Sequence, residues 1–335
     1  MLLEVEDLHV EFRTREGVAR AINGVNFDLR EGETLAILGE SGSGKSVTAQ
    51  AVMGILDTPP GYVTGGSIRY CGRDLLTMKE KERRGIRGAH ISMIFQDALS
   101  SLNPVFPVGW QIAEMFRQHR GMNRAEARDQ AVRLMEKVAI PAAKQRINSF
   151  PHQFSGGMRQ RIMIAMAIAL DPAVLIADEP TTALDVTVQA QIMQLLAELQ
   201  EESRMGLILI THDLGVVADV ADRIAVMYAG QIVEQADVHD VYRQPAHPYT
   251  KGLLESIPRI DQKGQELAAI GGLPPNLLNI PPGCPFNPRC AYAIDDCREG
   301  EPPALQPVGE RRMAACLRSD DVLADGAAAD REELR

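Results

Sequence analysis

The sequence lacks an excess of positive charge and lacks any long hydrophobic run. Its 35 lysines and arginines are outnumbered by 45 aspartates and glutamates, which gives a formal net charge of −10. This balance argues against a general nucleic-acid binder, because such a protein needs a basic face to displace counterions. No apolar run approaches the roughly 18 residues that a membrane-spanning helix needs. Residues 1–6 have neither a basic region nor an apolar core, so we expect no signal peptide and a cytosolic chain.

Cysteine is also scarce, and its distribution is uneven. Four of the five cysteines, Cys284, Cys290, Cys297 and Cys316, follow the spacing C-x5-C-x6-C-x18-C near the C-terminus. In a cytosolic chain such a group favours a metal over disulfides. The spacing lacks the C-x2-C pair of common zinc fingers, and four thiolates suit either a [4Fe–4S] cluster or zinc. The alternative of no metal, or of disulfides, also stays open.

The segment from Gly39 to Ser46, Gly-Glu-Ser-Gly-Ser-Gly-Lys-Ser, fits the phosphate-loop pattern G-x-x-x-x-G-K-[ST] at every fixed position. Small residues there let successive backbone N–H groups surround phosphate oxygens. Lys45 adds a charge for the β- and γ-phosphates, and the Ser46 hydroxyl is a ligand for Mg²⁺. We expect a buried strand over 34–38 before the loop and a helix over 47–55 after it, whose N-terminus faces the anion. The segment therefore predicts nucleotide binding.

Polar side chains end three of the apolar strands that the sequence predicts. Asp178 and Glu179 follow the strand over 173–177, where they are suited to hold Mg²⁺ and to polarise an attacking water. Gln96 follows the strand over 89–95 and is suited to ligate Mg²⁺ or to hold that water. His212 follows the strand over 206–210, where it can sense the γ-phosphate. Each residue alone is a weak signal, and such a histidine is more often structural.

Further patterns describe the surroundings of these residues. Ser155-Gly156-Gly157 begins a helix, and free N–H groups at a helix N-terminus attract anions. Alternating residues over 2–12 and 18–29 predict an antiparallel β-layer, in which Phe12 either stacks on adenine or belongs to the core. Helical spacing over about 99–150 predicts a helical subdomain inserted into an α/β core. The alternation of apolar strands and helices predicts a mostly parallel sheet.

About residues 1–255 resemble the nucleotide-binding subunit of ABC transporters. The resemblance rests on an ordered set of motifs: the phosphate loop, Gln96, Ser155-Gly156-Gly157, Asp178-Glu179, Asp185 and His212. The resemblance implies a P-loop NTPase fold, with Lys45 and Ser46 as Walker A, Asp178 as Walker B and Glu179 as the catalytic base. It implies that Gln96 is the Q-loop residue, Asp185 the D-loop residue and His212 the switch histidine. Phe154 and Met158 flank the Ser-Gly-Gly where Leu and Gln are usual, but the expected phosphate-binding part is intact.

The motifs and the resemblance together predict the following site residues. The expected catalytic residues are Glu179, His212 and Gln96; the expected nucleotide-binding residues are Phe12, Gly39, Ser41, Gly42, Ser43, Gly44, Lys45, Ser46, Val47, Ser155, Gly156, Gly157 and Asp185; the expected Mg²⁺ ligands are Ser46, Gln96 and Asp178. The Ser-Gly-Gly turn and the phosphate loop are separated by the helical subdomain. Two ATPase subunits, facing head to tail, would therefore sandwich each ATP, and ATP would stabilise the closed dimer.

The C-terminal part narrows the resemblance. The segments 247–254 (His-Pro-Tyr-Thr-Lys-Gly-Leu-Leu) and 283–290 (Gly-Cys-Pro-Phe-Asn-Pro-Arg-Cys) are similar to the C-terminal region of peptide-importer ATPases of the dipeptide/oligopeptide (DppD/OppD) type, which includes nickel and glutathione importers. The resemblance favours a structural [4Fe–4S] cluster. We expect an ATPase domain over 1–255 with its helical subdomain at about 98–160, an irregular cysteine-rich extension over 256–317, and a disordered tail over 318–335.

The resemblance also implies partners and a place in the cell. It implies two transmembrane permease subunits, a second and paralogous ATPase subunit, and an external substrate-binding protein. The chain would then be peripheral on the cytoplasmic side of a bacterial inner membrane, bind no nucleic acid, and energise uptake of di- or oligopeptides, with nickel or glutathione as alternatives. A soluble ABC ATPase acting on DNA is the rival hypothesis, and the acidic charge argues against it.

Overall fold

The fold is described from a computed structural model, which covers residues 1–97, 101–182, 184–256 and 270–325. The chain divides into two compact units, and each unit gathers stretches that lie far apart in the sequence. The first unit comprises residues 1–3, 29–33 and 75–210, and the second comprises residues 4–28, 34–74 and 211–335. Within the described residues, no helix is long and apolar enough to span a bilayer.

The first unit contains three parallel strands. They are β6 (Ile91–Ile94), β7 (Val174–Asp178) and β8 (Gly206–Ile210), with β7 paired to both neighbours. All three strands are buried along their whole length, as expected of parallel strands that are covered on both faces. The predicted strands over 89–95, 173–177 and 206–210 are therefore present, and their carboxyl ends lie at the same edge.

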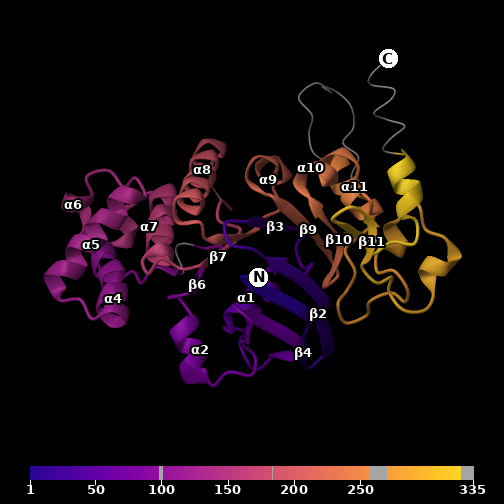
Figure 1. The fold of residues 1–335 in the computed structure, drawn as a ribbon, viewed down its shortest axis with the longest axis horizontal. Helices are drawn as coiled ribbons and strands as arrows, with labels where there is room; N and C mark the ends of the chain where they lie inside the picture. The colour runs from indigo at the N-terminus through magenta and orange to yellow at the C-terminus, as the bar shows by residue number, and fades with distance from the viewer. Residues whose placement is uncertain (98–100, 183, 257–269, 326–335) are drawn as a thin grey trace, which may run out of the picture. The chain divides into compact units, whose positions relative to one another are not determined.

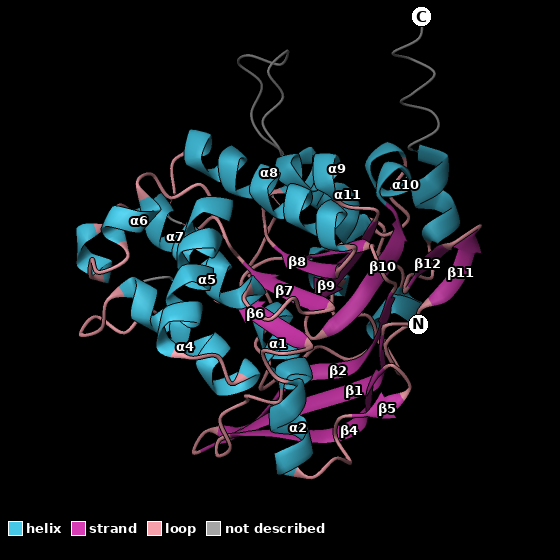
Figure 2. Cartoon of the chain, turned by 60° about the vertical axis from the view of Figure 1, so that its left-hand side comes forward, coloured by secondary structure: helices cyan, strands magenta, loops and turns pink. Residues whose placement is uncertain are grey.

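Helices make up most of the rest of the first unit. They are α2 (Glu80–Ile86), α4 (Val108–Arg120), α5 (Arg124–Lys137), α6 (Ala143–Arg146), the short η1 (Pro151–Gln153), α7 (Gly156–Ile168) and α8 (Val186–Ser203). Figures 1 and 2 show α4, α5, α6 and α7 gathered into one helical group. The Asn123 side chain begins α5 by accepting hydrogen bonds from the N–H groups of Ala125 and Glu126.

The second unit contains an antiparallel sheet in the strand order β2-β1-β4-β5. Its strands are β1 (Leu3–Thr14), β2 (Gly17–Leu29), β4 (Gly61–Tyr70) and β5 (Arg73–Asp74), and the terminal residues Leu3 and Leu29 belong to the first unit. Buried residues alternate with exposed ones along much of β1 and β2. This is the antiparallel layer that the alternating sequence predicts.

A second group of strands in this unit follows the order β11-β12-β10-β9-β3. The strands are β3 (Thr34–Leu38), β9 (Arg223–Tyr228), β10 (Gln231–Asp237), β11 (Gln306–Gly309) and β12 (Arg312–Ala314). β3 pairs in parallel with β9, whereas β9 and β10 form an antiparallel hairpin. The helices of the unit are α1 (Lys45–Met53), α9 (Leu214–Val220), α10 (Val238–Arg243) and α11 (Pro248–Glu255), with the short η2 (Asn287–Arg289) and η3 (Asp295–Arg298).

The C-terminal extension is more regular than the sequence predicts. Strand β12 pairs with β10, and β11 pairs with β12, so the extension adds two strands to the sheet. Residues 319–325 are helical, with Ser319 and Val322 buried, and the rest of the predicted disordered tail lies outside the described residues. The acid-rich composition of the tail gives no indication that these two side chains are buried.

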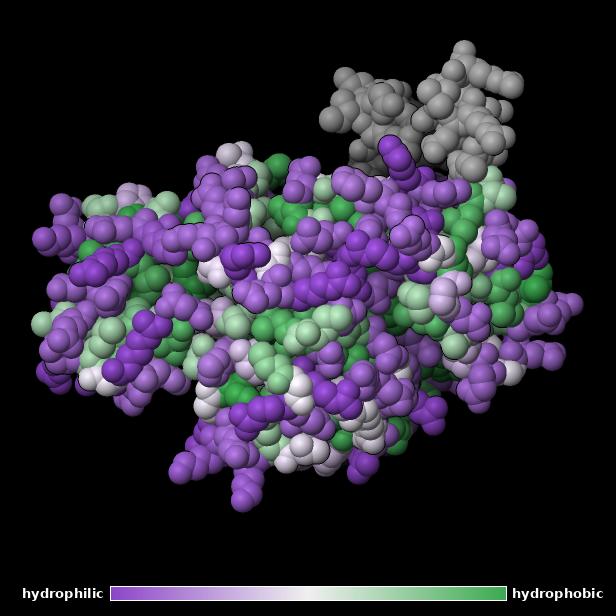
Figure 3. Space-filling view, viewed as in Figure 1, coloured by the Kyte–Doolittle hydropathy of each residue, from purple (hydrophilic) through white to green (hydrophobic). Residues whose placement is uncertain are grey.

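On the face drawn in Figure 3, hydrophobic residues are interspersed with hydrophilic ones.

Candidate functional site

The phosphate loop joins the buried strand β3 to the helix α1 in the second unit. Gly39, Gly42 and Gly44 have φ angles of 152°, 80° and 108°, which side chains with a Cβ atom rarely adopt. A Cβ atom at Gly44 would lie 2.8 Å from the carbonyl oxygen of Ala21, whereas a Cβ atom at Gly42 would meet nothing within 4 Å. The loop is therefore packed on its protein side and open at Gly42.

Two polar side chains inside the loop fit a bound phosphate. Lys45 is only 5% exposed, and its Nζ donates to the carbonyl oxygens of Gly39 and Glu40 at 2.7 and 2.9 Å. The Ser43 hydroxyl is buried, and among the described residues it has no hydrogen-bond partner. A buried hydroxyl without a partner is costly unless something else satisfies it. Together with the open cradle at Gly42, it fits the phosphate oxygens of a nucleotide.

Two more of the expected residues lie on the helix that follows the loop. Ser46 and Val47 are the second and third residues of α1, and both are half-buried. Ser41, in contrast, is exposed at the tip of the loop. These placements keep a hydroxyl at the first turn of α1, where a Mg²⁺ ion beside the phosphates would need one.

The two acids of the first unit follow β7 in the predicted way. Asp178 is the last residue of the strand and is buried. Glu179 has a φ angle of +46°, and its N–H donates to the Ile210 carbonyl oxygen of β8 at 2.8 Å. Its carboxylate oxygen Oε2 accepts hydrogen bonds from Gln96 Nε2 and Thr182 Oγ1, both at 2.9 Å. The structure thus brings Gln96 and Glu179 together, as expected of residues that end neighbouring strands.

Thr182 is a functional candidate that sequence reasoning missed. Its backbone N–H donates to the Glu179 carbonyl oxygen at 3.2 Å, and its hydroxyl donates to the Glu179 carboxylate. The spacing of three residues between Glu179 and Thr182 was a usable signal, because a turn of that length brings the side chain of its last residue close to its first residue. Thr182 and Gln96 together fix one oxygen of the carboxylate.

The Ser-Gly-Gly turn begins α7 in the first unit. Ser155 is the N-cap residue, and its hydroxyl accepts from the Met158 N–H at 3.4 Å. Ser155 and Gly156 are exposed, and N–H groups in the first turn of a helix are suited to bind an anion. A Cβ atom at Gly157 would lie 2.6 Å from Val188 of α8, so a larger residue there would separate the two helices. Asp185 begins α8 by accepting from the Val188 N–H at 3.0 Å, and its side chain is exposed beside this turn.

His212 and Phe12 both belong to the second unit. The N–H of Thr211 donates to the carbonyl oxygen of Ile37 in β3 at 3.4 Å, and β3 is the strand that leads into the phosphate loop. His212 is the next residue after Thr211, and it is exposed. Phe12 is half-buried in β1, and a Cβ atom at Gly61 would lie 3.0 Å from its ring. This packing explains a core role for the ring, and stacking on adenine remains a prediction.

Comparison with known proteins identifies the family. The ABC transporter family matches residues 22–182, and the family described as oligopeptide/dipeptide transporter, C-terminal region, matches residues 233–297. The oligopeptide transport ATP-binding protein OppD of Salmonella typhimurium is 52% identical over 95% of this chain and 94% of its own length. The dipeptide transport ATP-binding protein DppD of Bacillus subtilis is 55% identical over 88% of each chain. The chain belongs to the ABC peptide-importer ATPases.

A solved structure supports the same fold. The dimeric structure of a post-hydrolysis state of an ATP-binding cassette bound to ADP and Pi has a TM-score of 0.63 and 29% identity to this chain, covering 70% of this chain and 98% of that one. The chain is thus the ATP-binding and ATP-hydrolysing subunit of a peptide importer. Membership of this family implies ATP and Mg²⁺ as ligands and membrane permeases as partners.

The prediction of a metal in the C-terminal extension of this peptide-importer ATPase is wrong. Among the residues that the structure covers, no group of three or more histidine, cysteine, aspartate or glutamate side chains is placed to hold a metal ion. The cysteines are free, so the disulfide alternative is not realised either. Burial raises the pKa of the Cys284, Cys290 and Cys316 thiols to about 11. The spacing alone could not report this burial.

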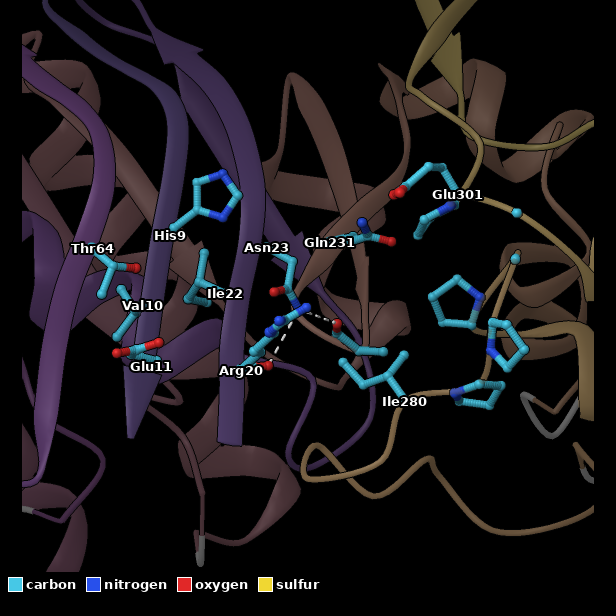
Figure 4. Close-up of a pocket in the computed structure, with 17 residues that line it drawn as sticks. His9, Val10, Glu11, Arg20, Ile22, Asn23, Thr64, Gln231, Ile280 and Glu301 are labelled. Atoms are coloured by element: carbon cyan, nitrogen blue, oxygen red, sulfur yellow. Dashed lines mark hydrogen bonds between the residues drawn. The ribbon is translucent and has the colours of Figure 1, made fainter. Parts of the chain in front are cut away.

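A cavity of about 390 Å³ lies in the second unit. Figure 4 shows Arg20 and Asn23 of β2 on one side of it and Ile280 and Glu301 of the extension on the other. Asn23 Nδ2 donates to the carbonyl oxygens of Arg20 and Ala229 at 3.3 and 3.5 Å, so this amide ties β2 to the β9–β10 turn. The lining contains no residue of the phosphate loop.

Proposed function

We propose that this chain hydrolyses ATP between its own phosphate loop and the Ser155-Gly156-Gly157 turn of a second ATPase subunit, and that this drives uptake of di- or oligopeptides through two permeases. The observation that carries the proposal is the Glu179 carboxylate, held by Gln96 and Thr182 at the end of β7. A fixed carboxylate at a strand end is suited to take a proton from an attacking water. Apart from this proton transfer, the protein contributes positioning and charge stabilisation, as is usual in phosphoryl transfer.

Each expected residue has a role in this proposal. The loop N–H groups, Ser43 and Lys45 hold the phosphates, Ser46 and Asp178 hold Mg²⁺, and His212 orients the γ-phosphate end. Mg²⁺, when bound, neutralises charge that develops on the phosphate oxygens. Gln96 bridges the base to the segment that leads into the helical group, because its amide donates to Glu179.

We place the permease contact on the helical group of the first unit. A cavity of about 340 Å³ there is lined by Phe106, Trp110, Met115 and Met166. The Phe106 and Trp110 rings stack with centroids 4.3 Å apart, and both side chains are exposed. Exposed aromatic residues beside a cavity are favourable anchors for a partner helix. The cavity belongs to the same unit as Gln96 and Glu179.

The permease contact is tested by one substitution. Trp110→Ala should reduce recovery of the permeases with the ATPase by about tenfold or more, because aromatic anchors carry much of an interface's energy. ATP binding by the isolated chain should not change. Leu273→Ala, at a residue 87% exposed in the extension, is the control. Equal recovery of permeases by the Trp110 variant and the wild type would place the contact elsewhere.

The finer organisation is also part of the proposal. Residues 1–255 form the ATPase domain with the helical subdomain at about 98–160, and residues 256–317 form the extension. We propose a paralogous ATPase as the second subunit, an external binding protein as the source of specificity, and a peripheral position on the cytoplasmic face of the membrane. A peptide is the proposed substrate, and nickel or glutathione are the alternatives within the same family.

Purification of the chain from membranes tests this assembly. The expected result is recovery of two permeases and a second ATPase, with ATP hydrolysis that rises when a peptide-loaded binding protein is added. Recovery of two identical ATPase chains would contradict the heterodimer alone. Recovery with DNA and without a membrane partner would favour the rival function.

A further inference from the structure

The C-terminal extension holds the phosphate loop through a part-buried ion pair. Glu40 is the second residue of the loop, and its two carboxylate oxygens accept from Arg289 Nη1 and Nη2 at 2.7 and 2.9 Å. The Arg289 side chain is 4% exposed and lies 249 residues further along the chain. A bidentate arginine–carboxylate pair fixes geometry as well as charge. The pair therefore fixes the orientation of a loop side chain from the far end of the protein.

Arg289 is itself held in place by the extension. Its Nε donates to the Gly271 carbonyl oxygen at 2.9 Å, and its guanidinium lies 5.8 Å from the Tyr228 ring centroid and 5.9 Å from that of Phe286. An arginine side chain that is hydrogen-bonded at Nε and lies near two aromatic rings has few rotamers available. It therefore loses little further conformational freedom when it binds a carboxylate. It acts as a rigid support rather than as a mobile surface charge.

A second residue of the C-terminal part holds the backbone of the same loop residue. The Tyr249 hydroxyl accepts from the Glu40 N–H at 2.8 Å, and the Tyr249 ring packs against Tyr228 and Phe286. The Glu40 carbonyl oxygen in turn accepts from Lys45 Nζ at 2.9 Å. The side chain, N–H and carbonyl oxygen of Glu40 are thus all engaged, and the last of them contacts the lysine that binds phosphate.

We propose that Arg289 and Tyr249 are positioning residues for ATP binding: they hold Glu40, and through it the phosphate loop and Lys45, in the conformation that accepts phosphate. The inference rests on the proposed role of this loop as the ATP site. It gives the C-terminal extension a function in nucleotide affinity. A buried arginine whose partner is removed leaves an uncompensated charge, so the loop is sensitive to either member of the pair.

The experiment measures the Kd for Mg·ATP of the full chain, with the thermal unfolding temperature recorded for each variant. Arg289→Met should weaken ATP binding by about tenfold, and Arg289→Lys by less, because lysine keeps the charge but loses the fork. Glu40→Gln combined with Arg289→Met should bind ATP no more weakly than Arg289→Met alone, since both act on one contact. The lysine variant keeps the test valid if the methionine variant does not fold.

The matched control is a second part-buried arginine pair of the same unit. Arg223 Nη1 and Nη2 donate to the Asp28 carboxylate oxygens at 3.2 Å, with side chains 11% and 30% exposed, and neither residue belongs to the loop. Arg223→Met should lower the unfolding temperature without changing the Kd. An unchanged Kd in both Arg289 variants, or an equal loss in Arg223→Met, would overturn the inference.

Failure of the underlying ATP site gives a different result. If Lys45→Ala left the Kd of the full chain unchanged, the phosphate loop would not be the site at all. If Lys45→Ala abolished binding while both Arg289 variants bound normally, the ATP site would stand and only the positioning role would be lost.

Discussion

At the scale of single residues, Glu179 combines a strained backbone with a fixed carboxylate. A φ angle of +46° is uncommon for a residue with a Cβ atom and costs of the order of 1–3 kcal/mol. The hydrogen bonds from Gln96 and Thr182 and the bond from its own N–H to Ile210 maintain this conformation. Strain that is maintained by several contacts is typical of a functional position.

Replacing Glu179 with glutamine tests its role as the base. Glu179→Gln should lower ATP hydrolysis by about a hundredfold or more, because a general base contributes at least that factor. ATP affinity should not fall, and the ATP-bound dimer should accumulate, as measured by gel filtration with ATP. Glu198→Gln, at an exposed position of α8, is the control. Full hydrolysis by the Glu179 variant would exclude it as the base.

His247 links the stability of the second unit to pH. Its side chain is buried, its Nδ1 accepts from the Tyr249 N–H at 3.1 Å, and burial lowers its pKa to about 3. The unfolded chain binds a proton near pH 6.5, whereas the folded chain does not until about pH 3. Stability from this group is therefore complete above pH 6.5 and falls by about 1.4 kcal/mol per pH unit below it. Glu234 accepts from the His247 N–H, and burial raises its pKa, which opposes part of this loss.

His247→Asn should make urea stability fall less steeply between about pH 6.5 and pH 4.5, because asparagine can still cap α11 and does not titrate. The measurement is the free energy of unfolding at several pH values. His152→Asn, at an exposed histidine of η1, is the control. A slope in the His247 variant equal to that of the wild type would contradict the assignment.

The residues of the site differ in how far the sequence could predict them. The phosphate loop follows from local physics, since its glycines and lysine are contiguous. The contact between Gln96 and Glu179 follows from strand order, because both residues end adjacent parallel strands. The pair Glu40–Arg289 spans 249 residues and leaves no local pattern. The cysteine spacing misled because the relative placement of side chains in the folded chain is not a property of spacing.

At the scale of elements, two helix glycines give a matched pair of tests. A Cβ atom at Gly109, in α4, would overlap the side chain and carbonyl oxygen of Ile147, whereas one at Gly85, in α2, would meet nothing within 4 Å. Gly109→Ala should therefore destabilise the protein by about 1–3 kcal/mol through overpacking. Gly85→Ala should stabilise it by up to about 1 kcal/mol through helix propensity. Urea unfolding measures the change in the free energy of unfolding for both variants. Equal changes would contradict the close packing of Gly109 against Ile147.

Most elements follow from the sequence, and the exceptions have a common cause. The buried strands β3, β7 and β8 are short apolar runs, and α8 is a long periodic helix, so their patterns are strong. Strands β11 and β12 are only four and three residues long, and β11 is mostly exposed. They exist because β12 pairs with β10 and β11 pairs with β12. Pairing with a distant strand is tertiary information that local propensity does not contain.

At the scale of the whole molecule, the proposed assembly gives the chain two incomplete halves of an ATP site. Its phosphate loop would accept one nucleotide, and its Ser-Gly-Gly turn would offer N–H groups to the nucleotide of the second subunit. Hydrolysis should therefore depend on assembly. The isolated chain at about micromolar concentration should hydrolyse ATP at least tenfold more slowly than the intact importer, and a rate per ATPase chain equal to that of the importer would contradict the shared site.

The coupling of peptide uptake to ATP hydrolysis by Glu179 is tested most directly by ATP-driven uptake into proteoliposomes that contain the whole importer and its binding protein. We predict that the wild-type chain supports uptake in step with ATP hydrolysis, and that Glu179→Gln in this chain abolishes sustained uptake while ATP still binds. Sustained peptide uptake at the wild-type rate with the Glu179→Gln chain would show that hydrolysis at this residue does not drive transport.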